Sequence, residues 1–102
     1  MFCIKDTNGI YLSANQAFAD RAGVRAPGDV HGKRAADLFP PELVEQYEAQ
    51  DDEVMRTGHI LSNELEAITR PDGSYGWFLT SKSRWTDDAG KPIGIVIVSV
   101  DQ

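Results

Sequence analysis

The densest pattern of hydrophobic positions lies in the last third of the chain. Residues 61–69, 77–86 and 93–100 are rich in β-branched and aromatic side chains, and the turn signals Pro71-Asp72-Gly73 and Asp87-Asp88-Ala89-Gly90 separate them. Glycine adopts the positive φ that a tight hairpin needs, and proline fixes its own φ in advance. The pattern predicts three antiparallel strands joined by two hairpins.

The last of these segments reads I-G-I-V-I-V-S-V and is apolar at almost every position. A strand in an antiparallel sheet with one wet face should alternate between apolar and polar residues. We therefore expect both faces of this sheet to be covered by other structure.

Short elements are expected in the first quarter of the chain. The hairpin signal Asp6-Thr7-Asn8-Gly9 separates two short strands, residues 2–5 and 10–14. Asn15 is a suitable N-cap for a helix over residues 16–22, and Gly23 is suited to end that helix.

A longer helix is expected in the middle of the chain. Residues 35–39 could form one helical turn, and a main helix should run from 42 to 57, with Pro41 in its first turn and Gly58 after its last. Strands at both ends of the chain with helices between them predict one α+β sheet with the helices on one face.

Composition limits the possible functions. With 102 residues and a net charge of −6, the chain should form a single soluble domain without a phosphate-binding surface. Cys3 is the sole cysteine, which excludes an internal disulfide and fits a reducing, cytoplasmic location. No apolar run approaches a membrane span, so we expect no membrane contact. The chain begins and stops beside expected strands, so it should be one domain, residues 1–102, cut from a larger signalling protein.

The order of these motifs resembles a PAS domain. The matching segments are residues 2–18, 37–42, 70–78 and 87–101, and the first strand is similar to the bacterial subgroup that reads F-x-x-K-D-x-x-G. This resemblance implies a five-stranded antiparallel sheet in the order 2-1-5-4-3, with short helices and one longer helix on one face. It also implies a cavity between sheet and long helix, and work beside an output domain such as a histidine kinase, a cyclic-dinucleotide enzyme or a transcriptional regulator.

The resemblance also identifies cofactor chemistry that this sequence lacks. Flavin-binding relatives carry a reactive cysteine where this chain has Ala35, and Cys3 on the first strand cannot replace it. Haem-binding relatives use a histidine on or near the long helix, whereas His31 and His59 fall outside it and are expected at the surface. These residues also lack ordinary metal-ligand spacing, so we expect no cofactor and no metal.

Enzyme signatures are missing as well. The sequence contains no phosphate-cradling glycine loop and no nucleophile elbow. Glu64 and Glu66 could be taken for an acid/base pair, but carboxylates two residues apart on a strand edge are usually solvated. We expect no catalytic activity.

Strand alternation leaves two registers for the sheet. In the simpler one, the apolar set of the fourth strand, which includes Trp77 and Trp85, faces inward. In the register that the resemblance implies, the cavity side carries Glu64, Glu66, Ile68, Phe78, Thr80, Lys82, Ile97 and Ser99. The outer side then carries Trp77, Leu79, Trp85, Val96, Val98 and Val100, which would form a surface for a second subunit or a flanking helix. We favour the second register, because a large apolar outer face is suited to such a partner.

In that register Lys82 is buried and needs a partner, since an unpaired buried charge is costly. Asp51 on the long helix, one turn after Tyr47, or a glutamate of the third strand could supply it. Three interpretations stay open. The group is a structural ion pair, or a polar cavity in which Lys82 holds an anionic or hydroxylated metabolite, or the register is wrong and these side chains lie in water.

These observations together predict a bacterial sensory PAS module of a two-component or transcriptional system. It would bind an unknown small molecule, form a homodimer, act on a covalently linked output domain and make no direct contact with nucleic acid. The alternative is a purely structural dimerisation module with a filled core. A redox or light sensor that carries a cofactor is the third class.

Overall fold

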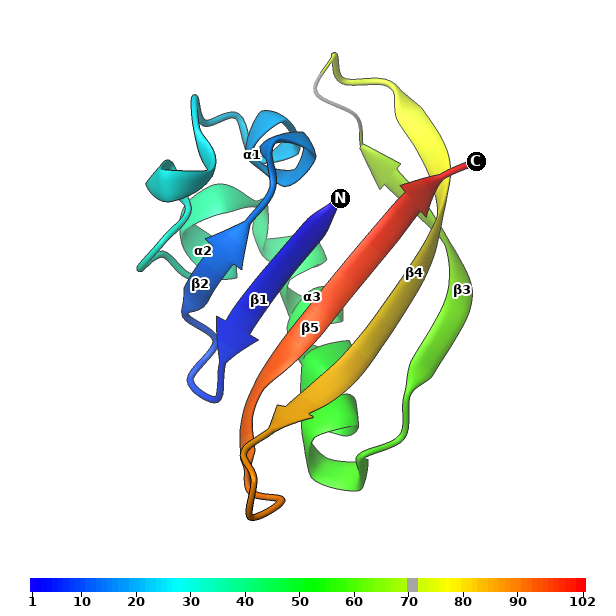
Figure 1. The fold of residues 1–102 in the computed structure, drawn as a ribbon. Coiled ribbons are helices and arrows are strands. Elements are labelled where there is room, and N and C mark those ends of the chain that lie inside the picture. The colour runs from blue at the N-terminus through cyan, green and yellow to red at the C-terminus, as the bar shows by residue number, and fades with distance from the viewer. Residues whose placement is uncertain (70–71) are drawn as a thin grey trace.

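The fold is a single antiparallel sheet with helices on one face (Figure 1). The computed structural model describes residues 1–69 and 72–102. Along the chain lie β1 (Phe2–Asp6), β2 (Tyr11–Ala14), α1 (Gln16–Ala22), the 3-10 turn η1 (Pro27–Asp29), α2 (Ala35–Leu38), α3 (Pro41–Thr57), β3 (Leu61–Thr69), β4 (Tyr75–Thr86) and β5 (Pro92–Asp101). The strand order is β2-β1-β5-β4-β3, so the predicted topology is confirmed.

The element boundaries agree with the sequence predictions to within two residues. The fourth strand begins at Tyr75 rather than at Trp77, and α2 ends one residue before Phe39. Gly73, in the predicted turn between the third and fourth strands, has the expected positive φ of 88°. Pro71 of that turn signal lies outside the described residues.

Local chemistry explains where the helices begin and end. The side-chain oxygen of Asn15 accepts hydrogen bonds from the backbone N–H of Phe18 and of Phe2, both at 3.1 Å. It therefore caps α1 and ties the start of that helix to β1. Gly58 ends α3 in the left-handed conformation, and the guanidinium of Arg84 donates to the carbonyl of Met55 there at 3.2 Å. A positive charge at the C-terminal end of a helix interacts favourably with the helix dipole.

A glycine on β5 lies close to the backbone of β1. Gly94 pairs with Asp6 on β1 and with Trp85 on β4. A Cβ atom at this position would lie 2.3 Å from the backbone oxygen of Lys5 and 3.1 Å from the Trp85 ring. Only glycine fits this close approach without moving the backbone.

The apolar core lies on the β1–β2 side of the molecule. Its buried members are Cys3, Tyr11, Phe18, Val30, Ala35 and Val44. Aromatic rings continue this core toward α3, since Phe39 packs edge-on against Phe18 and against Tyr47, with both centroid distances at 5.9 Å. The helix side of β4 instead carries the polar side chains of Thr80 and Lys82 beside Phe78.

Exposure along β4 decides between the two registers. Lys82 is 3% exposed and Thr80 is 1% exposed, whereas Trp77 is 58% exposed. The charged set therefore faces the helices and the tryptophans face outward. The register that places the tryptophans inward is wrong, and the one that the resemblance implies is confirmed.

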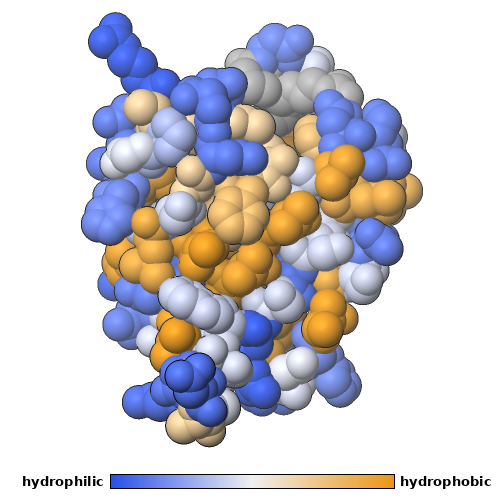
Figure 2. All heavy atoms as spheres, in the orientation of Figure 1, coloured by the Kyte–Doolittle hydropathy of each residue, from blue (hydrophilic) through white to orange (hydrophobic). Residues whose placement is uncertain are grey.

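The outer face of the sheet is apolar and open. Its half-buried or exposed residues are Leu65, Trp77, Leu79, Trp85, Val96, Val98 and Val100. Figure 2 shows this face with hydrophobic residues across its middle and hydrophilic ones around much of the rim. Among residues 1–69 and 72–102 no helix lies over it, because all helices pack on the opposite side. The expected cover of this face is therefore absent from the described stretch of the chain.

Candidate ligand cavity

A shared carboxylate joins α3 to two strands of the sheet. Asp51 accepts a hydrogen bond from the ammonium of Lys5 on β1 at 2.7 Å and from that of Lys82 on β4 at 2.9 Å. Both lysines are 3% exposed and Asp51 is 8% exposed. Asp51 was one of the two kinds of partner that the sequence offered for Lys82, the other being a glutamate of the third strand.

Lys5 was not assigned a role from the sequence, although it lies in the motif that carries the resemblance. The signal that could have found it is alternation, because Cys3 and Lys5 share one face of β1 and both are buried. The ammonium of Lys5 changes the net charge of this buried group. One carboxylate faces two ammonium groups, so this group carries a surplus positive charge in a region of low dielectric.

A second polar group lies further along the same face. Glu66 accepts from the side-chain amide of Gln50 at 2.8 Å and from the hydroxyl of Thr80 at 3.2 Å. The Thr80 and Ser99 hydroxyl oxygens are 2.9 Å apart. Because the single proton of Thr80 is donated to Glu66, the bond between the hydroxyls is donated by Ser99.

These groups surround a cavity of about 50 Å³ between the sheet and α3. The space is enough for a few water molecules or a molecule of a few heavy atoms, at roughly 10–15 Å³ for each water. The lining residues are Met1, Phe2, Cys3, Lys5, Tyr11, Phe18, Arg21, Tyr47, Asp51, Glu66, Ile68, Thr80, Lys82, Ile97 and Ser99.

Most of the residues proposed from the sequence lie together around this cavity. They are Tyr47, Asp51, Glu66, Ile68, Thr80, Lys82, Ile97 and Ser99. Phe78 is buried on the same face but does not line the cavity. Placing Glu64 in the cavity was wrong, because its side chain is exposed. Glu64 is opposite Thr80 on β3, the edge strand, where a carboxylate reaches water directly.

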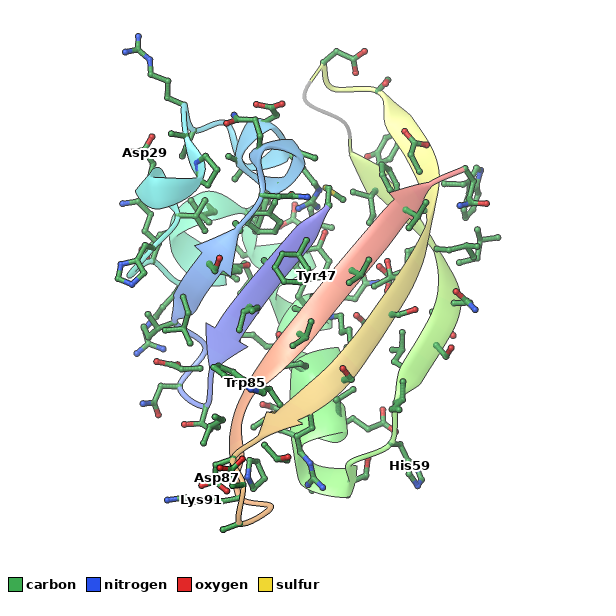
Figure 3. All side chains as sticks on the ribbon, viewed as in Figure 1. Asp29, Tyr47, His59, Trp85, Asp87 and Lys91 are labelled. Atoms are coloured by element: carbon green, nitrogen blue, oxygen red, sulfur yellow. The ribbon has the colours of Figure 1, made fainter. Side chains whose placement is uncertain are left out.

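Arg21 of α1 was also missed by sequence reasoning. Its guanidinium lies over the ring of Phe39, with 4.4 Å to the centroid, and donates a hydrogen bond to the hydroxyl of Tyr47. Its Nε is buried and has no hydrogen-bond partner among the described residues. Figure 3 places Tyr47 near the centre of the molecule, in projection between β1 and β5. Burial raises the pKa of the Tyr47 hydroxyl, so this group stays neutral.

Cys3 contributes a neutral thiol to the cavity wall. Burial raises the pKa of this thiol from 9.0 to about 12, despite the nearby positive charges of Lys5, Lys82 and Arg21. Burial likewise raises the pKa of Tyr11. Since the thiolate is the reactive form, Cys3 is chemically inert at neutral pH and contributes packing.

A surface groove of about 270 Å³ adjoins the cavity. It runs between the β1–β2 turn, the start of α2 and α3, and Lys5 and Asp51 line both spaces. The ion pair between these two side chains therefore belongs to the wall that separates the cavity from the groove.

Metal-ligand clusters and membrane-spanning helices are missing from the described residues. Within these ranges, no group of three or more histidine, cysteine, aspartate or glutamate side chains could hold a metal ion. His31 and His59 are both exposed, and Figure 3 places His59 at the loop beyond α3. None of the described helices is long and apolar enough to cross a membrane.

The family comparison agrees with this architecture. The family model for the PAS fold matches residues 1–102. The chain belongs to the PAS family. Among curated proteins, none matches it.

Solved structures of PAS proteins superimpose closely on this domain. The Vibrio cholerae VqmA dimer without target DNA, described as a LuxR-type receptor, is 27% identical with a TM-score of 0.88. The match covers 99% of this chain and 45% of that one. VqmA bound to DPO is 27% identical with a TM-score of 0.87, over 99% of this chain and 51% of that one.

The PAS domain of Bordetella pertussis BvgS is 25% identical, with a TM-score of 0.81, over 99% of this chain and 75% of that one. This PAS domain spans about half the length of the VqmA chains it matches. The VqmA structures are of receptors rather than enzymes, which is consistent with a sensory module.

Proposed function

We propose that this PAS domain binds a small molecule in the cavity between sheet and α3 and relays its presence to a linked output domain. The observation that carries the proposal is the buried surplus of charge, in which Lys5 and Lys82 share the single carboxylate of Asp51. Replacing a buried ion pair by apolar residues is often neutral or stabilising, so stability alone gives little reason to keep such a group. A ligand in the adjacent cavity would interact with this charge, which gives a functional reason to keep it.

The relatives support the same conclusion. VqmA, at 27% identity over nearly the whole of this chain, has been solved as a dimer, bound to DPO, and in a complex with ligand and DNA. We therefore favour a transcriptional regulator or a two-component protein as the output, with this domain contacting the ligand and not the nucleic acid. A cytoplasmic location and the absence of catalysis belong to this proposal.

The relay would use the contacts between α3 and the sheet. A ligand that contacts Tyr47 and Lys82 at once bridges the helix and β4, so it favours one packing of α3 over another. Such a two-state bias needs only different affinities for the two states. The outer face, around Trp77 and Val100, would carry the change to a second subunit.

The direct test is native mass spectrometry of freshly purified protein, which should detect a co-purified small molecule. DPO is the first compound to titrate, followed by organic acids and amines, with the melting temperature as readout. A ligand at 100 times its Kd stabilises the folded state by about 2.7 kcal/mol.

Replacing Lys82 by methionine sharpens this test. Lys82→Met should abolish the thermal response to any ligand of the cavity, because it removes a buried cation from the wall and leaves Asp51 paired with Lys5. Lys91→Met, at an exposed position, is the matched control and should respond like the wild type. An unchanged response of Lys82→Met would remove Lys82 from the site.

The open outer face favours one rival function, a structural dimerisation module with a closed interior. Sedimentation velocity separates the two. A tight dimer with neither an adduct in the mass spectrum nor a thermal response to any compound would favour the rival.

A further inference from the structure

We propose that the ligand of this cavity is a small monocarboxylate, held by Arg21 and Lys82; this inference rests on the function proposed above. The ionisable side chains of the wall give the first reason. Three are cations, Lys5, Arg21 and Lys82, and two are anions, Asp51 and Glu66. A single negative charge on the ligand balances the set.

The unused hydrogen-bonding capacity gives the second reason. Arg21 Nε is a buried donor without a partner among the described residues. Buried donors are nearly always satisfied, and a carboxylate oxygen satisfies a guanidinium with a strong, charge-assisted bond. Glu66 does not serve this donor, since its carboxylate oxygens accept from Gln50 and Thr80 and no hydrogen bond joins it to Arg21 Nε.

The two cations lie around one aromatic ring. The guanidinium carbon of Arg21 is 5.5 Å from the centroid of the Tyr47 ring, and the ammonium of Lys82 is 5.7 Å from the same centroid. Both cations also line the same cavity, where Ile97 adds an apolar wall. An anion bound there lies near two positive charges.

The size and the opposite wall restrict the acid further. A space of about 50 Å³ admits a carboxylate with only a few other heavy atoms. The Ser99 hydroxyl donates its proton to Thr80, so its oxygen remains free to accept. Short hydroxy acids match this arrangement, with the carboxylate at the cations and the hydroxyl at Ser99.

The experiment compares acids with their uncharged amides on the wild-type domain. Acetate, glycolate and lactate are titrated against acetamide, glycolamide and lactamide at constant ionic strength, and binding is followed by ¹⁵N NMR. The acid should bind about 10- to 100-fold more tightly than its amide, the factor expected for a hydrogen bond to a charged group. The Arg21 Nε–H resonance should move during the titration.

Two variants locate the contact. Arg21→Gln should lose at least about tenfold in affinity for the acid and little for the amide, since one strong charge-assisted bond is removed. Arg25→Gln, at an exposed arginine four residues on, is the control and should bind as the wild type does. If Arg21→Gln does not fold, the acid-to-amide ratio and the Nε–H signal of the wild type still decide.

The outcomes separate this inference from the function on which it rests. Equal affinity for acid and amide, or an Arg21 Nε–H resonance that does not move, overturns the proposal that the ligand is a carboxylate. Binding of DPO or an amine at Lys82, with no acid bound, overturns the carboxylate and leaves the sensory function standing. If no compound binds and the native mass spectrum shows bare protein, the sensory function fails as well.

Discussion

The two faces of the sheet differ in an unusual way, because charged side chains are buried on one and large apolar side chains are exposed on the other. Facing the helices, Lys82 is 3% exposed and sits in a charged group. Facing outward, Trp77 and Val100 are 58% and 56% exposed. Hydrophobicity alone therefore does not decide which side of a strand is buried. Charges tolerate burial where each has a partner, and an exposed apolar face of this extent marks a place for a partner surface.

The largest effect should come from removing the shared carboxylate of the inner face. Asp51→Ala leaves Lys5 and Lys82 buried without a counter-charge, so the free energy of unfolding should fall by about 3–5 kcal/mol. Urea denaturation of the wild type and the variant measures this difference in the free energy of unfolding. The matched control is Asp52→Ala, at the exposed neighbour on α3, which should change stability by no more than about 0.5 kcal/mol. Equal losses in the two variants would show that the inner charges are not held by Asp51.

A smaller loss is expected at Gly94, within the sheet that separates the two faces. Gly94→Ala forces a Cβ toward the carbonyl of Lys5 and the ring of Trp85, and should cost about 1–3 kcal/mol as other overpacking changes do. Gly28→Ala is the control, because nothing lies within 4 Å of the position that its methyl group would take. A Gly94→Ala protein as stable as the control would mean that β1 and β5 separate easily.

The smallest effect on folding should come from the outer face. The double variant Trp77→Ser and Val100→Thr changes side chains that are already more than half exposed, so the isolated domain should lose less than about 1 kcal/mol. Self-association should weaken, as measured by sedimentation equilibrium. A wild-type domain that stays monomeric at high concentration would show that a second copy is not what covers this face.

The sequence was most informative where the chemistry is local. The Asn15 cap, the Gly58 stop and the hairpin glycines act within a few residues, so the helices and strands could be predicted to within two residues. Local signals did not determine which face of the sheet each side chain of a strand occupies. Alternation on β4 allowed both registers. The resemblance suggested the one in which Lys82 is buried, and the large apolar outer face favoured it.

The residues of the cavity that sequence reasoning missed are placed by long-range contacts. Arg21 lies on a seven-residue helix, and its partner Tyr47 is 26 positions away. Lys5 meets Asp51 across 46 positions. Glu64 has the parity of Glu66 yet lies in water, because parity does not reveal which stretch of an edge strand the helix reaches. The ligand-binding role of the predicted residues stays a prediction.

The wall that Lys5 and Asp51 share between cavity and groove bears on how fast a bound molecule leaves. A solute that passes between the two spaces must separate an ammonium from a carboxylate only 2.7 Å away, so this passage waits for a fluctuation of the protein. Along this route, occupancy lags behind a falling concentration outside. A sensory domain with such an ion pair at its exit would stay occupied through brief falls in ligand concentration.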